Sequence, residues 1–351
     1  MTATADTERP PGALMAAEIA EQPRALQRLL DDGLPALREV AAQIARRRPR
    51  FALLAARGTS DHAALYAKYL IEIGLGLPAG LASPSTLTTY GGRPDYGDVL
   101  WITVSQSGGS PDLVDSTAVA RSRGALTVAV TNAADSPLAA TADLHLDVLA
   151  GPELAVAATK SYTSELLALF LLIDAWGGGD GSPARALPEC AQQVLEDGVA
   201  RDLAPRYRFV ERLLVTARGY AYASAREAAL KMMETSYLSA HAFSGADLMH
   251  GPLAMIDEDR PVIAIVGPGE GGAALAPVLD HLHQRRADVL VVGDAPAAPW
   301  AAAAVPLPAT DERIGPVLHI LPLQQLAHAM AVARGYDPDA PRGLRKVTET
   351  R

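Results

Sequence analysis

The sequence predicts an α/β protein with two similar domains, each built on a parallel β-sheet flanked by helices. Three observations lead to this fold class. Apolar runs typical of buried strands alternate with stretches of helical spacing. The length of 351 residues suggests about two domains. The tripeptide Ala-Arg-Gly occurs at 56–58 and again at 217–219, inside longer stretches that resemble each other, which indicates an internal duplication.

In the first half, residues 13–31 have helical spacing that Pro23 interrupts, and residues 35–48 give a second helix. Residues 51–56 predict a strand, which a glycine turn connects to a helix at 61–73. The other predicted elements are a short strand near 79–83, a strand at 99–104, a helix at 111–123, strands at 125–130 and 145–149, and a helix at 159–176. This alternation favours a parallel sheet covered on both faces.

The second half begins after a segment rich in glycine and proline, 175–189, which is the best candidate for a linker. There, VIAIVGPGE at 262–270 corresponds to WITVSQSGG at 101–109, and ADVLVVGD at 287–294 corresponds to GALTVAVTN at 124–132. A helix is expected at 224–238, whereas 241–256 lacks clear periodicity and is expected to be an ordered loop. We therefore expect five parts, which are an N-terminal tail and helix (1–34), a first domain (35–176), a linker and helix (177–205), a second domain (206–335) and a C-terminal tail (336–351).

Composition excludes several classes of function. The formal net charge of −9 argues against a nucleic-acid-binding surface, which needs a basic patch. Cys190 is the only cysteine, so neither a disulfide nor a cysteine-based metal site is expected within one chain, and the eight histidines show no ligand pattern for a metal. The N-terminus lacks the apolar core of a signal peptide, and no run of about 18 apolar residues occurs. We expect a soluble cytoplasmic protein.

The segment WITVSQSGGSPD at 101–112 is the first candidate for a ligand site. An apolar run ends there in hydroxyls and glycines and leads into a helix. Backbone N–H groups at a helix N-terminus attract anions, and glycines let the backbone approach them. The segment lacks the Gly-Lys-Ser/Thr of a nucleotide P-loop. A single phosphate or a sugar is therefore the expected ligand.

Three charged residues form the second candidate. Glu227, Lys231 and Glu234 are spaced i, i+4 and i+7, which places them on one face of the predicted helix. A surface Glu–Lys pair is the simpler interpretation. However, the helix starts at a βα turn, at the sheet edge where open α/β sheets bind ligands. His250 and Lys346 have no local signal that separates a catalytic role from a structural or exposed one.

A competing motif lies in the second half. Gly267, Gly269 and Gly272 form a G-x-G-x-x-G between a predicted strand and a predicted helix, and Asp294 follows about 20 residues later. This is the dinucleotide-binding fingerprint. Against it stand Pro268 and the duplication, which makes this loop the counterpart of the serine-rich segment of the first half.

Several motifs together resemble the sugar isomerase (SIS) family. They occur in order from residue 56 to the C-terminus: ARGTS, VSQSGGS, ELAVAATKSYTSE, AREAALKMMETSY, DLMHGPLAMI, LPLQQLAHAMA and APRGLRKVTE. The combination is similar to the double-SIS isomerase half of glucosamine-6-phosphate synthase and to the stand-alone glucosamine-6-phosphate deaminases. The resemblance implies two tandem SIS domains, each a flavodoxin-like three-layer sandwich, and a C-terminal tail that belongs to the active site.

The resemblance also implies roles for individual residues. The sugar phosphate would be bound by Gly58, Thr59, Ser60, Ser105, Gln106, Ser107 and Ser110, with Val156, Ala157 and Ala158 as a second line of the pocket. Glu234 would be the base that moves a proton between C1 and C2, with Lys231 and Glu227 beside it. His250 would open the sugar ring from a neighbouring subunit of a homodimer, and Lys346 would engage the open-chain carbonyl. No metal or organic cofactor is implied.

These roles leave three functions open. The first is conversion of glucosamine 6-phosphate to fructose 6-phosphate and ammonia, or a closely related isomerisation. The second is a lyase that removes the C2 proton of N-acetylglucosamine 6-phosphate and expels water. The third is a phosphosugar sensor without catalysis, although no fused DNA-binding module is visible in the sequence. Removal of a proton next to a carbonyl needs a positioned carboxylate, which both enzymatic alternatives assign to Glu234.

Overall fold

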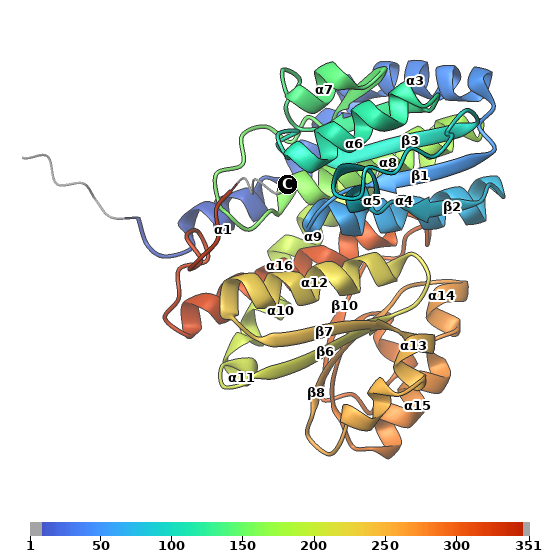
Figure 1. The fold of residues 1–351 in the computed structure, drawn as a ribbon. Helices are drawn as coiled ribbons and strands as arrows, with labels where there is room; N and C mark the ends of the chain where they lie inside the picture. Colours follow the sequence, from blue (N-terminus) through green and yellow to red (C-terminus); the bar gives the residue numbers. More distant parts are fainter. Residues whose placement is uncertain (1–8, 347–351) are drawn as a thin grey trace, which may run out of the picture.

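The first domain of the computed structural model is a parallel sheet enclosed by helices (Figure 1). The structure describes residues 9–346, so positions 1–8 and 347–351 of the two predicted tails lie outside the described residues. Ahead of the sheet come α1 (Ala13–Ala20), α2 (Gln22–Arg28), the π-helix η1 (Leu29–Gly33) and α3 (Leu34–Arg47). The domain continues with β1 (Phe51–Ala55), α4 (Thr59–Leu75), β2 (Ala79–Leu81), α5 (Pro84–Thr88), β3 (Val99–Ser105), α6 (Pro111–Ser122), β4 (Leu126–Thr131), α7 (Pro137–Thr141), β5 (Leu144–Asp147) and α8 (Lys160–Trp176).

The second domain follows a helical connection. This connection consists of η2 (Ser182–Ala184), α9 (Leu187–Asp197), α10 (Val199–Asp202) and α11 (Ala204–Tyr207). The domain then comprises β6 (Arg212–Ala217), α12 (Ala221–Ser236), β7 (Ser239–Ser244), α13 (Gly245–Met249), η3 (Pro252–Met255), β8 (Pro261–Val266), α14 (Glu270–Ala273), α15 (Ala276–Gln284), β9 (Asp288–Gly293), η4 (Ala295–Ala297), β10 (Ala303–Pro306) and α16 (Gly315–Ala333).

The two sheets have the same topology, which supports the duplication inferred from the sequence. The strand order is β2-β1-β3-β4-β5 in the first sheet and β10-β9-β8-β6-β7 in the second, and neighbouring strands pair in parallel. Numbered within each domain, both orders are 2-1-3-4-5, the flavodoxin-like arrangement. The chain changes direction across the sheet between β1 and β3, and between β6 and β8. Ligands of such sheets bind at the carboxyl ends of the strands beside that point.

One sequence expectation is wrong. Residues 241–256 were expected to form a loop, but 239–244 are strand β7, which pairs with β6 from Arg212↔Ser239 to Ala217↔Ser244. Strand β7 lies at the edge of its sheet, so several of its side chains are exposed and a polar residue such as His241 is tolerated. The continuous apolar run that marks a central strand is therefore missing.

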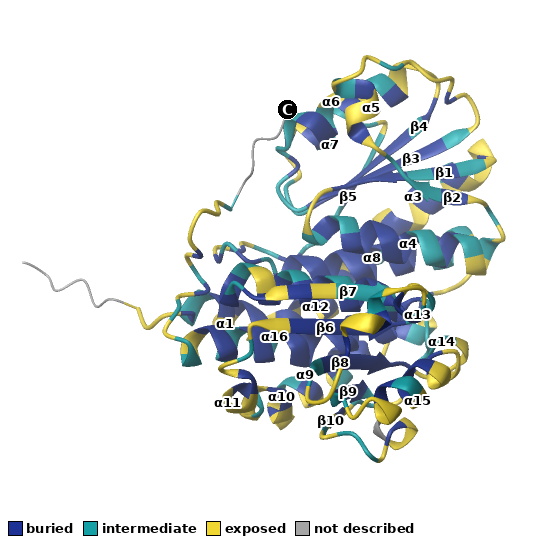
Figure 2. Ribbon diagram, turned by 60° about the horizontal axis from the view of Figure 1, so that its bottom comes forward, coloured by how far each residue is buried: buried dark blue, intermediate teal, exposed yellow. Residues whose placement is uncertain are grey.

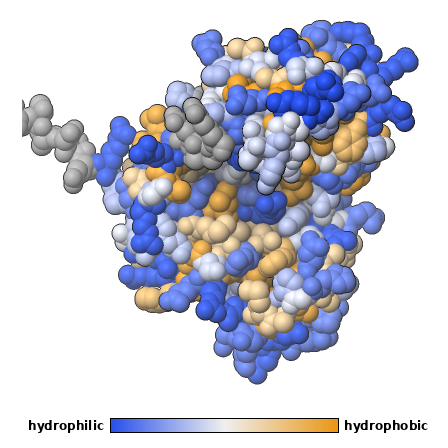
Figure 3. Space-filling model, in the orientation of Figure 1, coloured by the Kyte–Doolittle hydropathy of each residue, from blue (hydrophilic) through white to orange (hydrophobic). Residues whose placement is uncertain are grey.

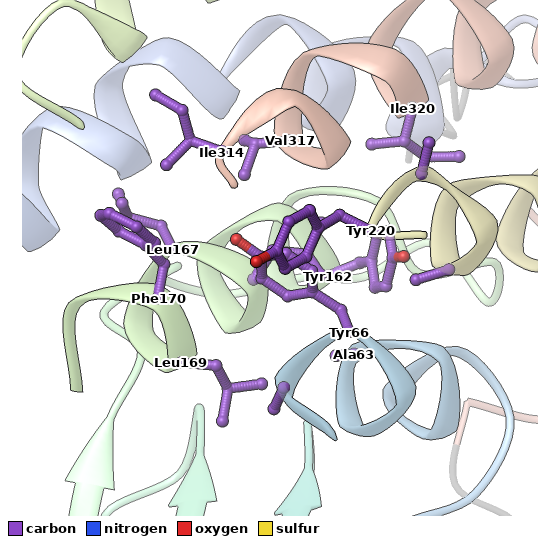
Figure 4. Packing of buried hydrophobic residues seen from close by; sticks show 14 of the residues in the cluster. Ala63, Tyr66, Tyr162, Leu167, Leu169, Phe170, Tyr220, Ile314, Val317 and Ile320 are labelled. Atoms are coloured by element: carbon purple, nitrogen blue, oxygen red, sulfur yellow. The ribbon is translucent and has the colours of Figure 1, made fainter. Parts of the chain in front are cut away.

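A layer of helices between the two sheets joins both domains into one core (Figure 2). Helices α4 and α8 of the first domain pack against α12 and α16 of the second. Tyr66, Tyr162 and Tyr220 lie together in this layer (Figure 4), and the rings of Tyr66 and Tyr220 meet edge to face with centroids 6.4 Å apart. The Tyr66 hydroxyl donates a hydrogen bond to the backbone carbonyl of Arg313, at 2.5 Å. The relative position of the two domains is thus set by buried contacts.

Candidate active site

A cavity of about 320 Å³ lies at the carboxyl edge of the first sheet, between the loops after β1 and β3. Helix α12 of the second domain and the C-terminal tail complete its wall. Every residue that the resemblance assigns to phosphosugar binding lines this cavity except Ala157, which is buried. The lining residues are Arg57, Gly58, Thr59, Ser60, Ser105, Gln106, Ser107, Ser110, Leu113, Val156, Ala158, Glu234, Leu344, Arg345 and Lys346.

The loop after β3 is shaped by its own hydroxyls. Ser105 Oγ accepts a hydrogen bond from the backbone N–H of Gly108 at 3.2 Å, and Ser107 Oγ accepts one from Gly109 at 3.2 Å. Gly108 has a φ of 59°, and a side chain there would collide with Ser136. The loop ends at Ser110, from which the 12-residue helix α6 begins. Hydroxyls and the amino end of a helix therefore face the cavity together, an arrangement that suits an anion.

The predicted cluster on α12 is assembled, but its members differ in access to the cavity. Lys231 Nζ lies 2.5 Å from Glu234 Oε2 and 3.3 Å from Glu227 Oε1. The side chains of Lys231 and Glu227 are 0% exposed, whereas that of Glu234 is 22% exposed and lines the cavity. Burial by itself would lower the pKa of Lys231, but the two carboxylates outweigh it and raise that pKa. Lys231 is therefore a fixed cation that holds Glu234 at the cavity wall.

Residues of the first domain support this cluster from the other side. His62 Nδ1 lies 2.8 Å from Glu227 Oε2, and the Thr59 hydroxyl donates to Glu227 Oε1 at 3.1 Å. Thr59 Oγ1 also accepts a hydrogen bond from Lys231 Nζ at 3.1 Å. Sequence reasoning missed the role of His62 because its partner lies 165 residues away. The site therefore needs both domains.

Lys346 is held on the tail side of the cavity. Its Nζ donates to Glu153 Oε2 and to the backbone carbonyl of Ala155, both at 2.7 Å. Burial opposes ionisation of Glu153, but the Lys346 ammonium and the backbone N–H groups of Ser161 and Thr159 lower its pKa. Glu153 is therefore an ionised partner for the lysine, which the sequence analysis did not identify.

The tail is anchored next to the N-terminal helix α1 (Figure 1). The Asp339 carboxylate accepts hydrogen bonds from the backbone N–H groups of Leu14 and Met15, both at 2.8 Å. The carboxylate of Glu18, on the same helix, accepts from the backbone of Leu154 and Ala155. Helix α1 thus connects the tail to the 151–158 segment that carries part of the cavity wall.

The comparisons with known proteins settle the family. The family model described as SIS domain matches residues 47–175 and 208–334. The chain belongs to the SIS-domain family. It is 36% identical over 353 residues to the glutamine–fructose-6-phosphate aminotransferase [isomerizing] of Pyrobaculum aerophilum, a match that covers 95% of this chain and 56% of that protein. The chain spans about half the length of the curated relatives it matches.

Two solved structures share this architecture over almost the whole chain. One is a Silicibacter pomeroyi DSS-3 protein provisionally named a phosphosugar isomerase, with a TM-score of 0.85 and 35% identity over 93% of this chain and 99% of that one. The other is the C-terminal domain of glucosamine-fructose-6-phosphate aminotransferase from Francisella tularensis, with a TM-score of 0.83 and 25% identity over 97% and 100%. The two parallel sheets described above are therefore tandem SIS domains.

His250 lies away from the cavity of its own chain. It follows α13 in the second SIS domain, is exposed, and is not among the residues that line the cavity. Among the described residues the structure thus assembles the predicted set except for this histidine.

Figure 3 shows apolar side chains gathered on the surface over α12 and β7 of the same domain.

The G-x-G-x-x-G loop of the second SIS domain is closed by a carboxylate of the same chain. Glu312 accepts hydrogen bonds from the backbone N–H of Gly271 at 2.7 Å and of Glu270 at 3.2 Å. The close packing of this loop accounts for its last glycine, since a Cβ on Gly272 would lie 1.9 Å from the Gly267 carbonyl oxygen. The N–H groups that a pyrophosphate would need are thus already used, which argues against the dinucleotide interpretation.

Two further absences concern residues 9–346. No helix in this range has the length and apolar character needed to cross a bilayer. The same range contains no group of three or more His, Cys, Asp or Glu side chains arranged to hold a metal ion.

Proposed function

We propose that this protein converts glucosamine 6-phosphate to fructose 6-phosphate and ammonia. The observation that supports this most is the presence of Glu234, Lys346 and the 105–110 loop around one cavity. This places a base and a cation within the reach of one small anionic ligand. The names of the relatives, which act on fructose 6-phosphate and phosphosugars, point to the same substrate class.

The phosphate of the substrate would lie against the 105–110 loop and the start of α6. Hydrogen bonds from Ser105, Ser107 and Ser110 hydroxyls, together with backbone N–H groups, would bind it. The carbon chain would then extend toward Glu234 and the tail. Binding the phosphate at one end orients the reacting C1–C2 end, which lowers the entropic part of the barrier.

The reaction proceeds on the open-chain sugar. Glu234 removes the proton from C2, which lies next to the C1 aldehyde, and returns it to C1. The C1 oxygen takes up a proton and becomes a hydroxyl, while the C2 amine gives up one of its protons and becomes an imine. Water adds to C2, ammonia leaves, and the C2 ketone of fructose 6-phosphate remains. The Lys346 ammonium stabilises the negative charge that develops on the oxygen at C1. Lys231 positions Glu234 through the 2.5 Å contact between them.

Ring opening requires a proton donor at the ring oxygen, and we assign it to His250 of the partner subunit in a homodimer. The assignment is supported by the position of His250, which is exposed and does not line the cavity of its own chain. Mixing His250→Ala chains with Glu234→Gln chains tests this assignment. Mixed dimers should recover one intact site and part of the activity, whereas absence of recovery in demonstrated mixed dimers places both residues in one chain.

A second function has support from the tail side of the cavity. Val156, Ala158 and Leu344 contribute apolar surface to the cavity, which Arg345 also lines. An acetamido group fits these surroundings, because its methyl suits the wall and its carbonyl accepts from an arginine. With N-acetylglucosamine 6-phosphate, loss of the C2 proton to Glu234 and of the C3 hydroxyl as water would give an unsaturated sugar.

Product analysis separates the two functions. The protein is incubated with glucosamine 6-phosphate and, separately, with its N-acetyl form. Ammonia and fructose 6-phosphate from the first substrate support the deaminase, whereas an ultraviolet-absorbing product from the second supports the lyase. Glu234→Gln should lower turnover by about 100- to 10,000-fold and leave substrate binding intact. Glu72→Gln, in the partly exposed pair between Lys68 and Glu72 on α4, is the matched control. Retention of more than a tenth of the wild-type rate by Glu234→Gln would exclude Glu234 as the base.

A further inference from the structure

Arg57 is a cation on the sheet edge that carries the serine loop. It lies two residues after the end of β1 and directly before Gly58, the N-cap of α4, and it lines the same cavity as Ser105 and Ser107. The other cations that line the cavity, Arg345 and Lys346, belong to the tail. A cation on this edge is notable because the 105–110 loop itself contains no charged side chain.

The Arg57 guanidinium is oriented by a buried carboxylate. Its Nε and Nη2 lie 2.9 and 2.7 Å from Asp112 Oδ2. The Asp112 side chain is 4% exposed, whereas that of Arg57 is 46% exposed. A guanidinium has five N–H donors, so this contact leaves others for the exposed side of the group. Asp112 therefore fixes the direction of the arginine while part of its charge faces the cavity.

The position of Asp112 favours a cation beside the proposed phosphate site. Asp112 lies in the first turn of α6, whose amino end faces the cavity next to Ser110. A phosphate bound there would stand close to this carboxylate, and two like charges at short range repel each other strongly in a partly buried site. Arg57 neutralises Asp112 and adds a donor that a phosphate can use.

We propose that Arg57 is a phosphate-binding residue of this site and that Asp112 is its positioning residue. The inference rests on the proposed function in so far as the ligand is a phosphosugar. It goes beyond that function by assigning the charge that makes the 105–110 loop selective for a phosphorylated over an unphosphorylated sugar. Arginine suits this role because its planar fork can contact a carboxylate on one side and a phosphate on the other.

The experiment must separate phosphate binding from simple neutralisation of Asp112. Dissociation constants of inorganic phosphate and fructose 6-phosphate are measured by calorimetry for the wild type, Arg57→Ala, Arg57→Lys and the double variant Arg57→Ala/Asp112→Asn. Thermal melting is recorded for each. Arg46→Ala, which breaks an exposed pair with Glu39, is the matched control and should change neither constant.

The single variant Arg57→Ala should raise the dissociation constants of both ligands by about 10- to 100-fold, which is the factor for losing a hydrogen bond to a charged group. Arg57→Lys keeps the charge and should retain part of the affinity. The double variant lacks both charges of the Arg57–Asp112 pair, so it should melt closer to the wild type than Arg57→Ala does and stay weak in binding. Wild-type affinity in the double variant would show that Arg57 only neutralises Asp112 and would overturn the proposal.

The outcome also distinguishes this inference from the proposed function. If phosphate and fructose 6-phosphate bind in an Arg57-dependent manner but neither aminosugar phosphate is turned over, the proposed reaction fails and the role of Arg57 stands. If Arg57→Ala binds both ligands as the wild type does, or the wild type binds neither, the inference is wrong whatever the reaction.

Discussion

Replacing Lys231 by methionine should destabilise the protein substantially. Methionine keeps the apolar stem of the side chain but removes an ammonium that is 0% exposed and lies 3.3 Å from Glu227 Oε1. Glu227, equally buried, then loses its cationic partner. Removal of one member of a buried ion pair costs about 3–5 kcal/mol. Because His62 and Thr59 still contact the Glu227 carboxylate, we expect the lower end, about 3 kcal/mol.

Urea denaturation followed by circular dichroism measures this change as the difference in unfolding free energy. The double variant Glu227→Gln/Lys231→Met should recover most of the loss, because no unpaired buried carboxylate remains. Lys68→Met breaks the partly exposed pair between Lys68 and Glu72 on α4 and should cost no more than about 0.5 kcal/mol. If Lys231→Met stays within about 1 kcal/mol of the wild type, the buried ammonium does not balance Glu227 and the description of the cluster is wrong.

Three further predictions concern pH, the phosphate loop and the tail. Burial raises the pKa of the Glu165 carboxyl well above 4.5, so the folded protein keeps a proton that the unfolded chain loses. The unfolding free energy should therefore fall above pH 4.5, by about 1.4 kcal/mol per pH unit, until the pH passes the pKa of Glu165 in the folded protein. Glu165→Gln should remove this pH dependence. Equal slopes of unfolding free energy against pH for the variant and the wild type between pH 5 and 8 would contradict the prediction. The double variant Ser105→Ala/Ser107→Ala should weaken the binding of glucosamine 6-phosphate by about 2–3 kcal/mol, measured by calorimetry. If the wild type binds unphosphorylated glucosamine equally well, the loop does not recognise the phosphate. Deletion of 343–351 should abolish turnover and leave the cooperative melting transition in place, since little apolar surface is removed; loss of that transition would show that the tail is part of the core.

The fold was predictable because its signals are local. Strands β1, β3 and β4 are central and apolar, and each was expected within one residue of its observed bounds. The repeat around Ala-Arg-Gly predicted two similar domains, whereas the flavodoxin-like arrangement was implied by the resemblance to the SIS family. Strand β7 was missed because an edge strand tolerates polar residues. Helix α12 begins three residues earlier than expected, at Ala221, directly after the turn at Gly219.

The candidate site was predictable where it follows a strand end and where Glu227, Lys231 and Glu234 share one face of a helix. Hydroxyls after a strand identify a loop at the carboxyl edge, which is why the 105–110 segment could be found. The partners that orient the charged groups could not, because they come from distant positions: Arg57 and Asp112 are 55 residues apart, and Lys346 and Glu153 are 193 apart. Their pairing depends on the packed arrangement of both domains and the tail, which composition and spacing do not report.

The carboxylate of Glu312 marks a difference between the two halves of the protein. Each half has a loop at the carboxyl edge of its own sheet, after β3 in the first half and after β8 in the second. In the first half, Ser105, Ser107 and Ser110 of this loop line the cavity. In the second half, the Glu312 carboxylate accepts hydrogen bonds from backbone N–H groups of the corresponding loop, at 2.7 and 3.2 Å. A side chain of the protein thus occupies the place of an anionic ligand there. Helix α12 of the second half contributes Glu234 to the cavity at the first sheet, so the two similar halves contribute different parts of the candidate site.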